Sequence, residues 1–411
     1  MKIDDEASIK YLEENYGKNI LPLSIGENKY FVGSRPLDLL LFYKKNTSIL
    51  KLQDSFLKAA EHYNLFSSRL IMIGQNKFAL QYCTDAIKIN ILPPINETFD
   101  NINIDDVKKM IVPVKTLPGE PLVAITGIPI KDGVFGGISC SHAITDGIAL
   151  MLFLYAWSCI IEDRDFLLPS PKRLFKGNPL RSDKIDKVFI PPLSELSDEI
   201  QNRVKSDHVK TYAKREYFSD EFLNEIKNKA KSENAEYNIS DHQIMTSFLL
   251  KKYHNYILPD TDKLRSTTPF DIREIHPDID SMYIGNAVCM SYTEFTKDEI
   301  DKMSIYEIAN RLKKSINSVR NENYIKKIIY LSKYGIEWDD DFINSPASDT
   351  SNDIVSVNLT HFNDLESMFL GPDIGSILYI SSPAPNQTSF VILKEKSGRI
   401  FAEITGRYPL T

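Results

Sequence analysis

The segment that most restricts the fold is the run from Ile148 to Ile161, in which nearly every side chain is apolar. It is shorter than the roughly 20 residues that a membrane-spanning helix needs, and two acidic residues, Glu162 and Asp163, follow it directly. We therefore predict a helix buried in the protein interior. The apolar strand predicted from Val134 to Ser139 comes shortly before it, so buried elements frame the turn between them on both sides.

The length and composition agree with a protein that can bury such a helix. The chain has 411 residues, more than one hydrophobic core usually serves, so we expect two lobes. Hydrophobic residues make up 42% and charged residues 26%, which argues against a largely disordered chain. The net charge of -7 argues against a nucleic-acid-binding protein, which needs a basic face to displace counterions from phosphate.

The first residues, Met1 to Lys18, are acidic and polar and lack the apolar core of a signal peptide. The four cysteines are scattered through apolar segments, which is typical of reduced thiols rather than of a disulfide framework or a zinc site. We therefore expect a cytoplasmic protein without a membrane span.

Helices and strands alternate irregularly along the chain, which predicts the α+β class with mixed sheets rather than a doubly wound parallel sheet. Apolar periodicity and capping serines predict helices at residues 51–63, 148–161, 219–231, 240–257 and 304–320. Strands are predicted at residues 69–73, 78–82, 122–128, 134–139, 376–381, 389–394 and 400–404. The charged, proline-containing stretch 164–209 predicts a crossover, and we divide the chain into an N-terminal lobe (1–180), a linker (181–215) and a C-terminal lobe (216–411).

The turn between the predicted strand and the apolar helix carries side chains suited to catalysis. It contains His142 and, four residues later, Asp146 followed by Gly147. Buried elements on both sides hold such a turn rigid. Histidine suits proton transfer because its ordinary pKa lies near neutral pH. A carboxylate at Asp146 can fix the turn by taking an arginine partner, and Gly147 permits close packing.

Three other interpretations of this turn are open on the residues alone. His142 can be a histidine with satisfied hydrogen bonds beside a solvated carboxylate, because short motifs often match by chance. His142 and Asp146 can be metal ligands, although no third ligand is evident. Ser141 or Cys140 can be a nucleophile, although the sequence has no Gly-x-Ser-x-Gly elbow.

The residues from His142 to Gly147 resemble the His-x-x-x-Asp-Gly motif of the BAHD acyltransferases. The same motif marks chloramphenicol acetyltransferase and the condensation domains of peptide synthetases. Those condensation domains usually carry a second histidine just before the first, where this chain has Ser141, so the BAHD branch fits better. Further segments resemble the family in the same order: Leu57–Leu70, Asn238–Leu250, Asp271–Arg273 and Tyr283–Ala287.

The resemblance extends over roughly residues 30 to 405 and implies two chloramphenicol-acetyltransferase-like lobes. Each would be a mixed β-sheet flanked by helices, with a substrate channel between them. It also implies a monomeric enzyme of secondary metabolism that moves an acyl group from acyl-CoA to a hydroxyl or amine of a small molecule. Acyl-CoA would be a co-substrate, and no cofactor or metal would be bound permanently.

The same resemblance implies a role for each matching residue. His142 would be the general base, and Asp146 would face away from the cleft and pair with Arg273, with Arg35 as the reserve partner. The channel wall that binds the donor would be shaped by Tyr283, Gly285 and Asn286.

One family motif is missing. Where the family has Asp-Phe-Gly-Trp-Gly, this chain has Met368 to Pro372, and where the family has Ser-Trp upstream, this chain has Asn358 to His361. The first motif is structural in the family, so its loss leaves the chemistry of His142 in place. The hydrogen-bond donor that stabilises the oxyanion of the tetrahedral intermediate then has to come from another segment. By position, Asn358 and Thr360 are the candidates, and the alternative is that both are ordinary strand residues.

The residues that bind the phosphates of the acyl donor, and the source of its acyl group, are further open points. Lys210, Lys214 and Arg215 could contact the phosphates of CoA, although charge runs are usually solvated. An enzyme that takes its acyl group from a carrier protein would differ only in its donor surface. A non-catalytic binding module of the same fold would tolerate the loss of His142, so retention of the whole motif favours the enzyme.

Overall fold

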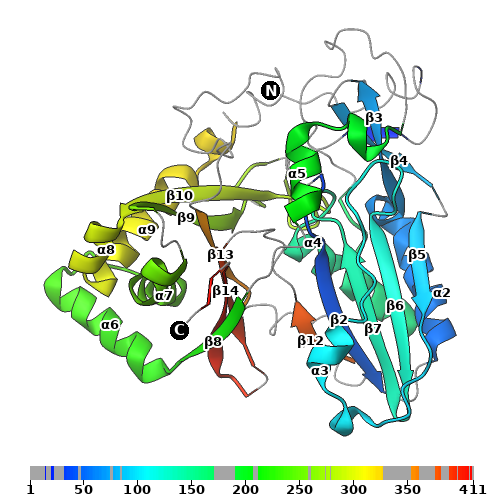
Figure 1. The fold of residues 1–411 in the computed structure, drawn as a ribbon, viewed down its shortest axis with the longest axis horizontal. Helices are drawn as coiled ribbons and strands as arrows, with labels where there is room; N and C mark the ends of the chain where they lie inside the picture. The colour runs from blue at the N-terminus through cyan, green and yellow to red at the C-terminus, as the bar shows by residue number, and fades with distance from the viewer. Residues whose placement is uncertain are drawn as a thin grey trace.

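The protein forms two lobes that lie side by side, each with a β-sheet and helices packed against it (Figure 1). The structure is a computed structural model that describes residues 14, 20–22, 32–44, 48–74, 77–83, 86–170, 190–206, 212–257, 261–273, 275–277, 279–326, 353–360, 375–380, 388–395, 397–406 and 408–409. Both sheets contain parallel and antiparallel pairs. The predicted α+β class with mixed sheets is therefore confirmed.

The sheet of the first lobe has β7 (Gly133–Cys140) at its centre. β7 pairs antiparallel with β2 (Leu37–Lys44) on one side and with β6 (Val123–Ile130) on the other, and all of its residues are buried. Beyond β6 lies β5 (Ile87–Ile91), which runs parallel to it, and beyond β2 lies β12 (Gly375–Ile380), which runs antiparallel. The strand that precedes His142 is thus held from both sides.

Two helices, α2 (Ile49–His62) and α4 (Gly147–Ile161), share a core with alternate residues of this sheet. The indole of Trp157 in α4 donates a 2.9 Å hydrogen bond to the Ser55 hydroxyl of α2 and packs edge-on against Phe56. The apolar run thus forms the buried helix that its composition predicts. On the opposite face of the sheet lies the short helix α3 (Ile104–Lys108). A small sheet in the order β1 (Ile20–Pro22), β4 (Lys77–Tyr82) and β3 (Ser68–Gly74) extends the lobe.

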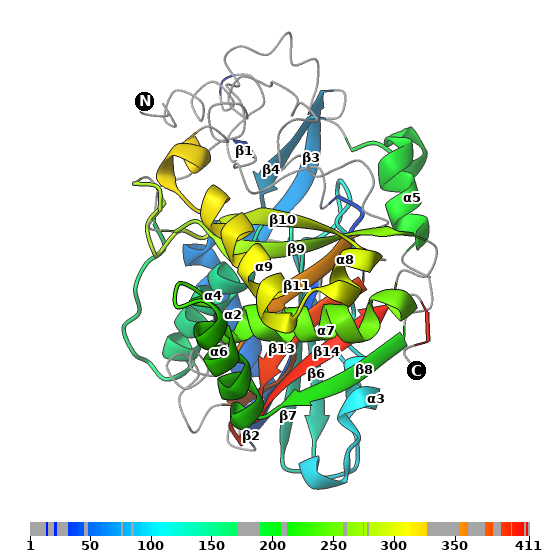
Figure 2. The ribbon, with the colours of Figure 1, turned by 90° about the vertical axis from the view of Figure 1, so that its left-hand side faces the viewer.

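The sheet of the second lobe has β11 (Asp353–Asn358) near its centre, parallel to both of its neighbours. In spatial order its strands are β10 (Val288–Thr296), β9 (Lys263–Asp271), β11, β13 (Thr388–Lys394), β14 (Ile400–Gly406) and β8 (Tyr212–Phe218). Figure 2 looks onto the helices that cover one face of it: α6 (Asp220–Glu233), α7 (Asp241–Ile257), α8 (Lys297–Lys302) and α9 (Ile305–Val319).

The helix starts of the second lobe follow the predicted capping serines. Ser219 accepts a hydrogen bond from the backbone N–H of Phe222, and Ser240 accepts one from Gln243. Ser304 and Glu307 form a reciprocal capping box at the start of α9. These three local predictions are confirmed.

Two strands, β12 and β8, differ from the predicted division of the chain into lobes. β12 comes from the C-terminal part of the chain but completes the first sheet, and β8 begins inside the range predicted as linker. The predicted crossover also contains a helix, α5 (Asp198–Ser206), which packs against Gly33. Composition can indicate a linker between two lobes, but it does not show that a later strand such as β12 pairs in the first lobe. Strand pairing depends on contacts between residues far apart in sequence.

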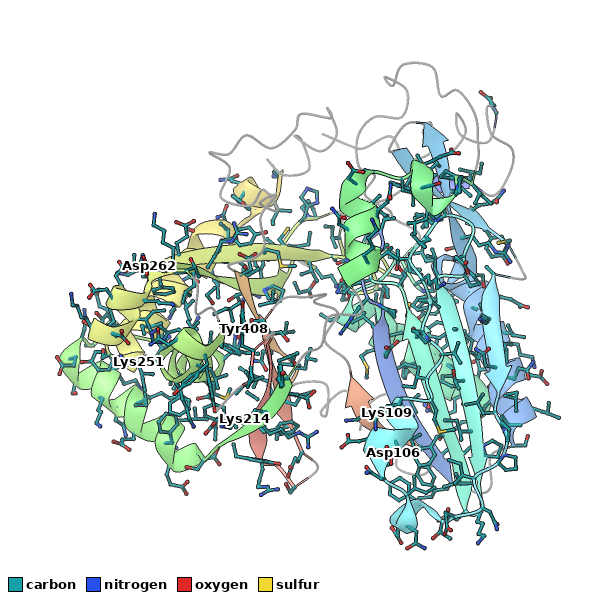
Figure 3. The ribbon with its side chains drawn as sticks, viewed as in Figure 1. Asp106, Lys109, Lys214, Lys251, Asp262 and Tyr408 are labelled. Carbon is teal, nitrogen blue, oxygen red and sulfur yellow. The ribbon has the colours of Figure 1, made fainter. Side chains whose placement is uncertain are left out.

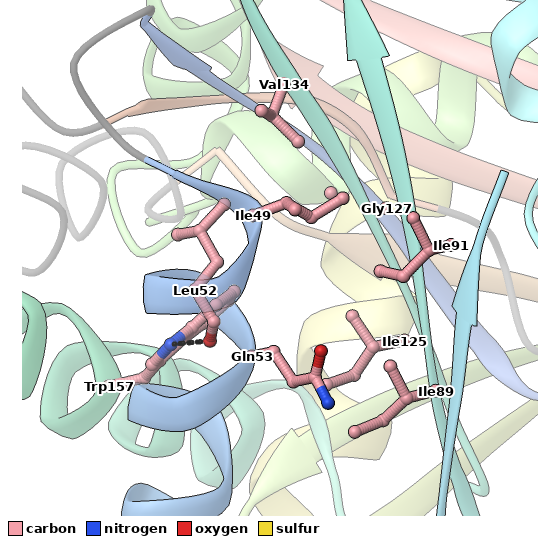
Figure 4. A pocket seen from close by; sticks show the side chains of 10 residues that line it. Ile49, Leu52, Gln53, Ile89, Ile91, Ile125, Gly127, Val134 and Trp157 are labelled. Carbon is pink, nitrogen blue, oxygen red and sulfur yellow. Dashed lines mark hydrogen bonds between the residues drawn. The ribbon is translucent and has the colours of Figure 1, made fainter. Parts of the chain in front are cut away.

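Among the described residues, no helix is both long and apolar enough to pass through a membrane. A small apolar cavity lies between α2 and the sheet, lined by side chains that include Ile49, Ile125 and Trp157 (Figure 4). None of its lining residues belongs to the turn that carries His142, so the cavity is separate from the candidate site.

Candidate active site

His142 lies in a short turn between the end of β7 and the start of α4. The last residue of β7, Cys140, is paired with Leu37 of β2 and with Val123 of β6. The next backbone N–H, that of Ser141, donates to the carbonyl of Leu122 at 2.8 Å. The turn therefore starts from a main chain that is held in place on both sides.

Asp146 is the N-cap of α4, and its carboxylate accepts four hydrogen bonds. Its Oδ1 accepts hydrogen bonds from Ala149 N at 2.8 Å and from Arg273 Nη2 at 3.1 Å. Its Oδ2 accepts them from Ala287 N at 2.7 Å and from Arg273 Nη1 at 2.9 Å. Asp146 is 1% exposed. The predicted pairing with Arg273, the first of the two candidates, is present, and it joins the turn that carries His142 to the second lobe.

Arg273 is itself fully engaged. Its Nη1 also donates to Asp271 Oδ1 at 2.9 Å, and its Nε and Nη2 donate to the carbonyl of Tyr283. Nη2 donates in addition to the carbonyl of Gly285. One guanidinium thus lies between two carboxylates, and burial raises the pKa of the Asp271 carboxyl above its usual value despite this neighbour.

Asn286 contacts His142 directly, which the sequence did not reveal. Its side-chain nitrogen lies 2.9 Å from His142 Nδ1 and 2.9 Å from the His142 carbonyl oxygen. Asn286 is 3% exposed. The resemblance predicted a place in a channel wall, whereas the contact holds the ring and the main chain of His142 together. Its role in donor binding stays a prediction.

Burial lowers the pKa of His142 below its ordinary value of 6.5. Hydrogen bonds to two carbonyl groups, its own and that of Thr145, together with the charge of Asp146, oppose this effect. The imidazole is therefore neutral at pH 7, which is the form that can accept a proton.

The nucleophile interpretation finds no support in this geometry. Cys140 and Ser141 are both fully buried, and burial raises the pKa of the Cys140 thiol. The Ser141 hydroxyl bonds to Thr116 and to the N–H of Ala143, so it is engaged inside the first lobe. As for the metal interpretation, no group of three or more His, Cys, Asp or Glu side chains within the described ranges is arranged to hold an ion.

The ends of two parallel strands bring further polar residues to the same edge of the second sheet. β9 ends at Asp271, just before Arg273, and β11 ends at Asn358 beside it, running in the same direction. Asn358 Oδ1 accepts hydrogen bonds from the N–H and the hydroxyl of Thr360, at 3.0 and 2.8 Å. Carboxyl ends of parallel strands commonly form ligand sites. The predicted role of Asn358 and Thr360 with an oxyanion stays a prediction.

Tyr283 and Gly285 lie behind Arg273. Tyr283 is 2% exposed, and its ring fills the space in which a Cβ on Gly285 would lie, with the ring atoms 2.7 Å away. Both residues give their carbonyl oxygens to the guanidinium. Their contacts thus support Arg273, and their predicted part in donor binding stays a prediction.

The basic residues considered for the CoA phosphates lie on β8. Lys214 faces α7, with its ammonium 5.6 Å from the centre of the Tyr253 ring, and Arg215 faces the other way and pairs with Glu403. Figure 3 shows Lys214 on the second lobe, whereas Lys109, directly after α3, belongs to the first. Lys210 and the segment from Met368 to Pro372 lie outside the described residues. Phosphate binding by Lys214 and Arg215 stays a prediction.

Sequence reasoning also missed a buried polar cluster beneath β11. His242 Nε2 lies 3.0 Å from the Ser356 hydroxyl, which lies 2.6 Å from the hydroxyl of Thr246. Burial lowers the pKa of His242 to about 4. The sequence predicts a helix at residues 240–257, but no sequence signal places residue 242 opposite residue 356.

Comparison with known proteins identifies the family. A family model described as "Transferase family" matches residues 21–359. The chain belongs to this family. The resemblance to the BAHD acyltransferases is thereby confirmed. An uncharacterised acetyltransferase of Arabidopsis thaliana is 25% identical over 226 residues, which are 51% of this chain and 48% of that protein. The chain thus matches about half the length of this curated relative.

Solved structures share the fold over nearly the whole chain. TRI101 of F. sporotrichioides, in a complex with coenzyme A and T-2, has a TM-score of 0.68 at 16% identity and covers 94% of this chain and 95% of its own. Vinorine synthase has a TM-score of 0.63 at 14% identity, with 95% and 92% covered. At these identities the likeness shows the fold, and it confirms the predicted two-lobed chloramphenicol-acetyltransferase-like architecture.

Proposed function

We propose that this member of the transferase family moves an acyl group from an acyl-CoA thioester to a hydroxyl or amine of a small-molecule acceptor. The observation that carries the proposal is the position of His142, a neutral imidazole in a turn whose main chain is tied to both lobes. The ties are the Asp146–Arg273 pair and the contact of Asn286 with the ring. A scaffold protein has no need of such a network around one histidine.

His142 is the general base in this proposal. We assign its ring proton to Nδ1, so that Nε2 accepts a proton. The amide group of Asn286 then donates to the carbonyl of His142, and its 2.9 Å approach to Nδ1 is a close contact between two N–H groups rather than a hydrogen bond. The acceptor loses its proton to Nε2 as its oxygen or nitrogen attacks the thioester carbonyl. Collapse of the tetrahedral intermediate then expels the CoA thiolate, which takes the proton from Nε2 and returns the imidazole to its neutral form. General-base assistance of this kind contributes about 10²–10⁴-fold to the rate.

Asn358 is the donor that stabilises the oxyanion. Its Oδ1 is occupied by the N–H and the hydroxyl of Thr360, which turns its Nδ2 away from that residue. No partner for that Nδ2 is found within the described part of the chain. Thr360 therefore orients Asn358, because its own hydroxyl proton is already donated. A preorganised amide donor of this kind contributes about 3 kcal/mol to the stability of the transition state.

Similar solved structures support the choice of acyl-CoA as donor. Two TRI101 structures contain coenzyme A together with T-2 or with deoxynivalenol. The family and the shared fold carry this donor class over to the present chain as a proposal, and the acceptor is proposed only as a small molecule with a hydroxyl or amine.

The test is a screen of acyl-CoA donors against pooled alcohols and amines. A thiol-specific colour reaction detects the released CoA, and mass spectrometry identifies the products. With a matched pair of substrates, His142→Ala should lower kcat by about 100-fold or more. His62→Ala is the control, because His62 is an exposed histidine at the end of α2. Retention of more than about a tenth of kcat by His142→Ala refutes the general-base role. If none of the acyl-CoA donors in the screen releases its thiol, the non-catalytic alternative is favoured.

A further inference from the structure

An extended segment, residues 111–117, lies across the first sheet and is held there by side-chain hydroxyls. We call this segment the strap. Thr126 and Ser139 of the sheet, and Ser141 directly after β7, alternate with Ile125, Ile138 and Cys140, which belong to the core shared with α2 and α4. Since successive strand residues point to opposite faces, the three hydroxyls point to the other face, where the strap lies.

Three hydrogen bonds at regular spacing attach the strap. The N–H of Val112 donates to the Thr126 hydroxyl at 3.0 Å, and the N–H of Val114 donates to the Ser139 hydroxyl at 3.0 Å. The third joins the hydroxyls of Thr116 and Ser141, which are 2.8 Å apart. The first bond lies beside the middle of β6, the second lies at the penultimate residue of β7, and the third lies at the residue before His142.

The third bond differs from the others in what it reaches. Ser141 Oγ also accepts the N–H of Ala143 at 3.2 Å, so its side chain bridges the main chain on both sides of His142. Thr116 and Ser141 are at most 1% exposed, which leaves water no access to replace a lost partner. The N–H of Gly33 donates to the carbonyl of Thr116, which holds Thr116 from the other side.

We propose that Thr116, acting through Ser141, is a positioning residue for His142 in the acyl transfer proposed above, on which this inference rests. Thr116 fixes the Ser141 rotamer that keeps the Ala143 N–H bonded. The turn then presents the imidazole to Asn286 in one orientation. Without the Thr116 hydroxyl, the Ser141 side chain turns to another partner and the turn loosens around His142.

The test compares one substitution at the two ends of the strap. Thr116→Val removes the hydroxyl next to the turn at nearly constant volume, and Thr126→Val removes the equivalent hydroxyl far from it. Thr116→Val should lower kcat about tenfold with KM unchanged, since small misplacements of a catalytic group cost this much or more. Thr126→Val should keep kcat within about twofold of wild type while losing similar thermal stability. Thr116→Ser should restore kcat. Ser141→Ala replaces Thr116→Val if the latter does not fold.

A second measurement needs neither donor nor acceptor. Nitrogen-15 NMR of the imidazoles, with the His142 signal assigned by its loss in His142→Ala, reports the titration of that ring. Thr116→Val should raise the pKa of His142 toward its ordinary value as water reaches the ring, and Thr126→Val should leave it unchanged. Equal kcat values and equal titrations in the two valine variants refute the proposal. If the wild-type protein transfers no acyl group at all, the proposed function is refuted. The NMR titration alone then tests whether Thr116 positions His142.

Discussion

Replacement of Asp146 by asparagine should weaken both the stability and the activity of the protein. The carboxylate accepts four hydrogen bonds, two on each oxygen, from Ala149, Ala287 and Arg273. An asparagine has the same shape but one oxygen, so whichever way its amide turns, its NH₂ group faces two N–H donors. Two buried donors are then left without an acceptor, and the charge of Arg273 loses its buried partner.

The size of the effect can be worked out from these contacts. Removal of one member of a buried ion pair costs about 3–5 kcal/mol. Arg273 keeps its 2.9 Å contact with Asp271, so the lower end of that range applies, about 3 kcal/mol. Because the pair joins the catalytic turn to the second lobe, we also expect kcat to fall by about tenfold or more.

A second carboxylate–arginine pair provides the control. Asp353 accepts two hydrogen bonds from Arg265, at 2.6 and 2.8 Å, in the sheet of the second lobe. Asp353→Asn should cost a similar free energy of unfolding in urea titrations and leave kcat within about twofold of wild type. An unfolding free energy of Asp146→Asn within about 1 kcal/mol of wild type refutes the reasoning, and so does an equal loss of kcat in both variants.

Three further results are expected. The acid limb of kcat/KM against pH should lie below about 6.5, because burial lowers the pKa of His142; an acid limb above pH 7 contradicts the assigned base. Gly285→Ala should lower the thermal midpoint, because the new methyl group displaces the buried Tyr283 ring 2.7 Å away, and an unchanged midpoint contradicts this packing. Burial lowers the pKa of His242 to about 4, so its contribution to stability is complete above pH 6.5 and is lost as pH falls toward 4. Urea titrations at several pH values should show up to about 3 kcal/mol of this loss in wild type and little of it in His242→Gln.

The sequence predicts the parts of the site that local pattern or family motif controls. Helix starts at Ser219 and Ser304 follow from capping chemistry within one turn, and the structure has them. The pair of Asp146 with Arg273 was predicted from the order of motifs along the chain, together with the rule that a buried carboxylate needs a partner.

Contacts without a local signal could not be predicted. The family resemblance assigns Asn286 only to a channel wall, and only the folded chain brings it to His142 across 144 positions. Thr116 and Ser141 are common residues in unremarkable surroundings, and their bond depends on where an irregular strap crosses the sheet. β12 has an ordinary strand pattern, which says nothing about the lobe in which it pairs.

The place of β12 in the first sheet constrains the order in which the protein can be made. β12 covers the outer edge of β2, and it is formed by residues 375–380, near the end of the chain. When only the N-terminal part of the chain has been synthesised, β2 is present and β12 is not. The edge of β2 that later pairs with β12 is then unpaired, and most residues of β2 are apolar. Such an edge is a template for pairing with other chains. That edge of β2 stays without its native partner until residues 375–380 have been made.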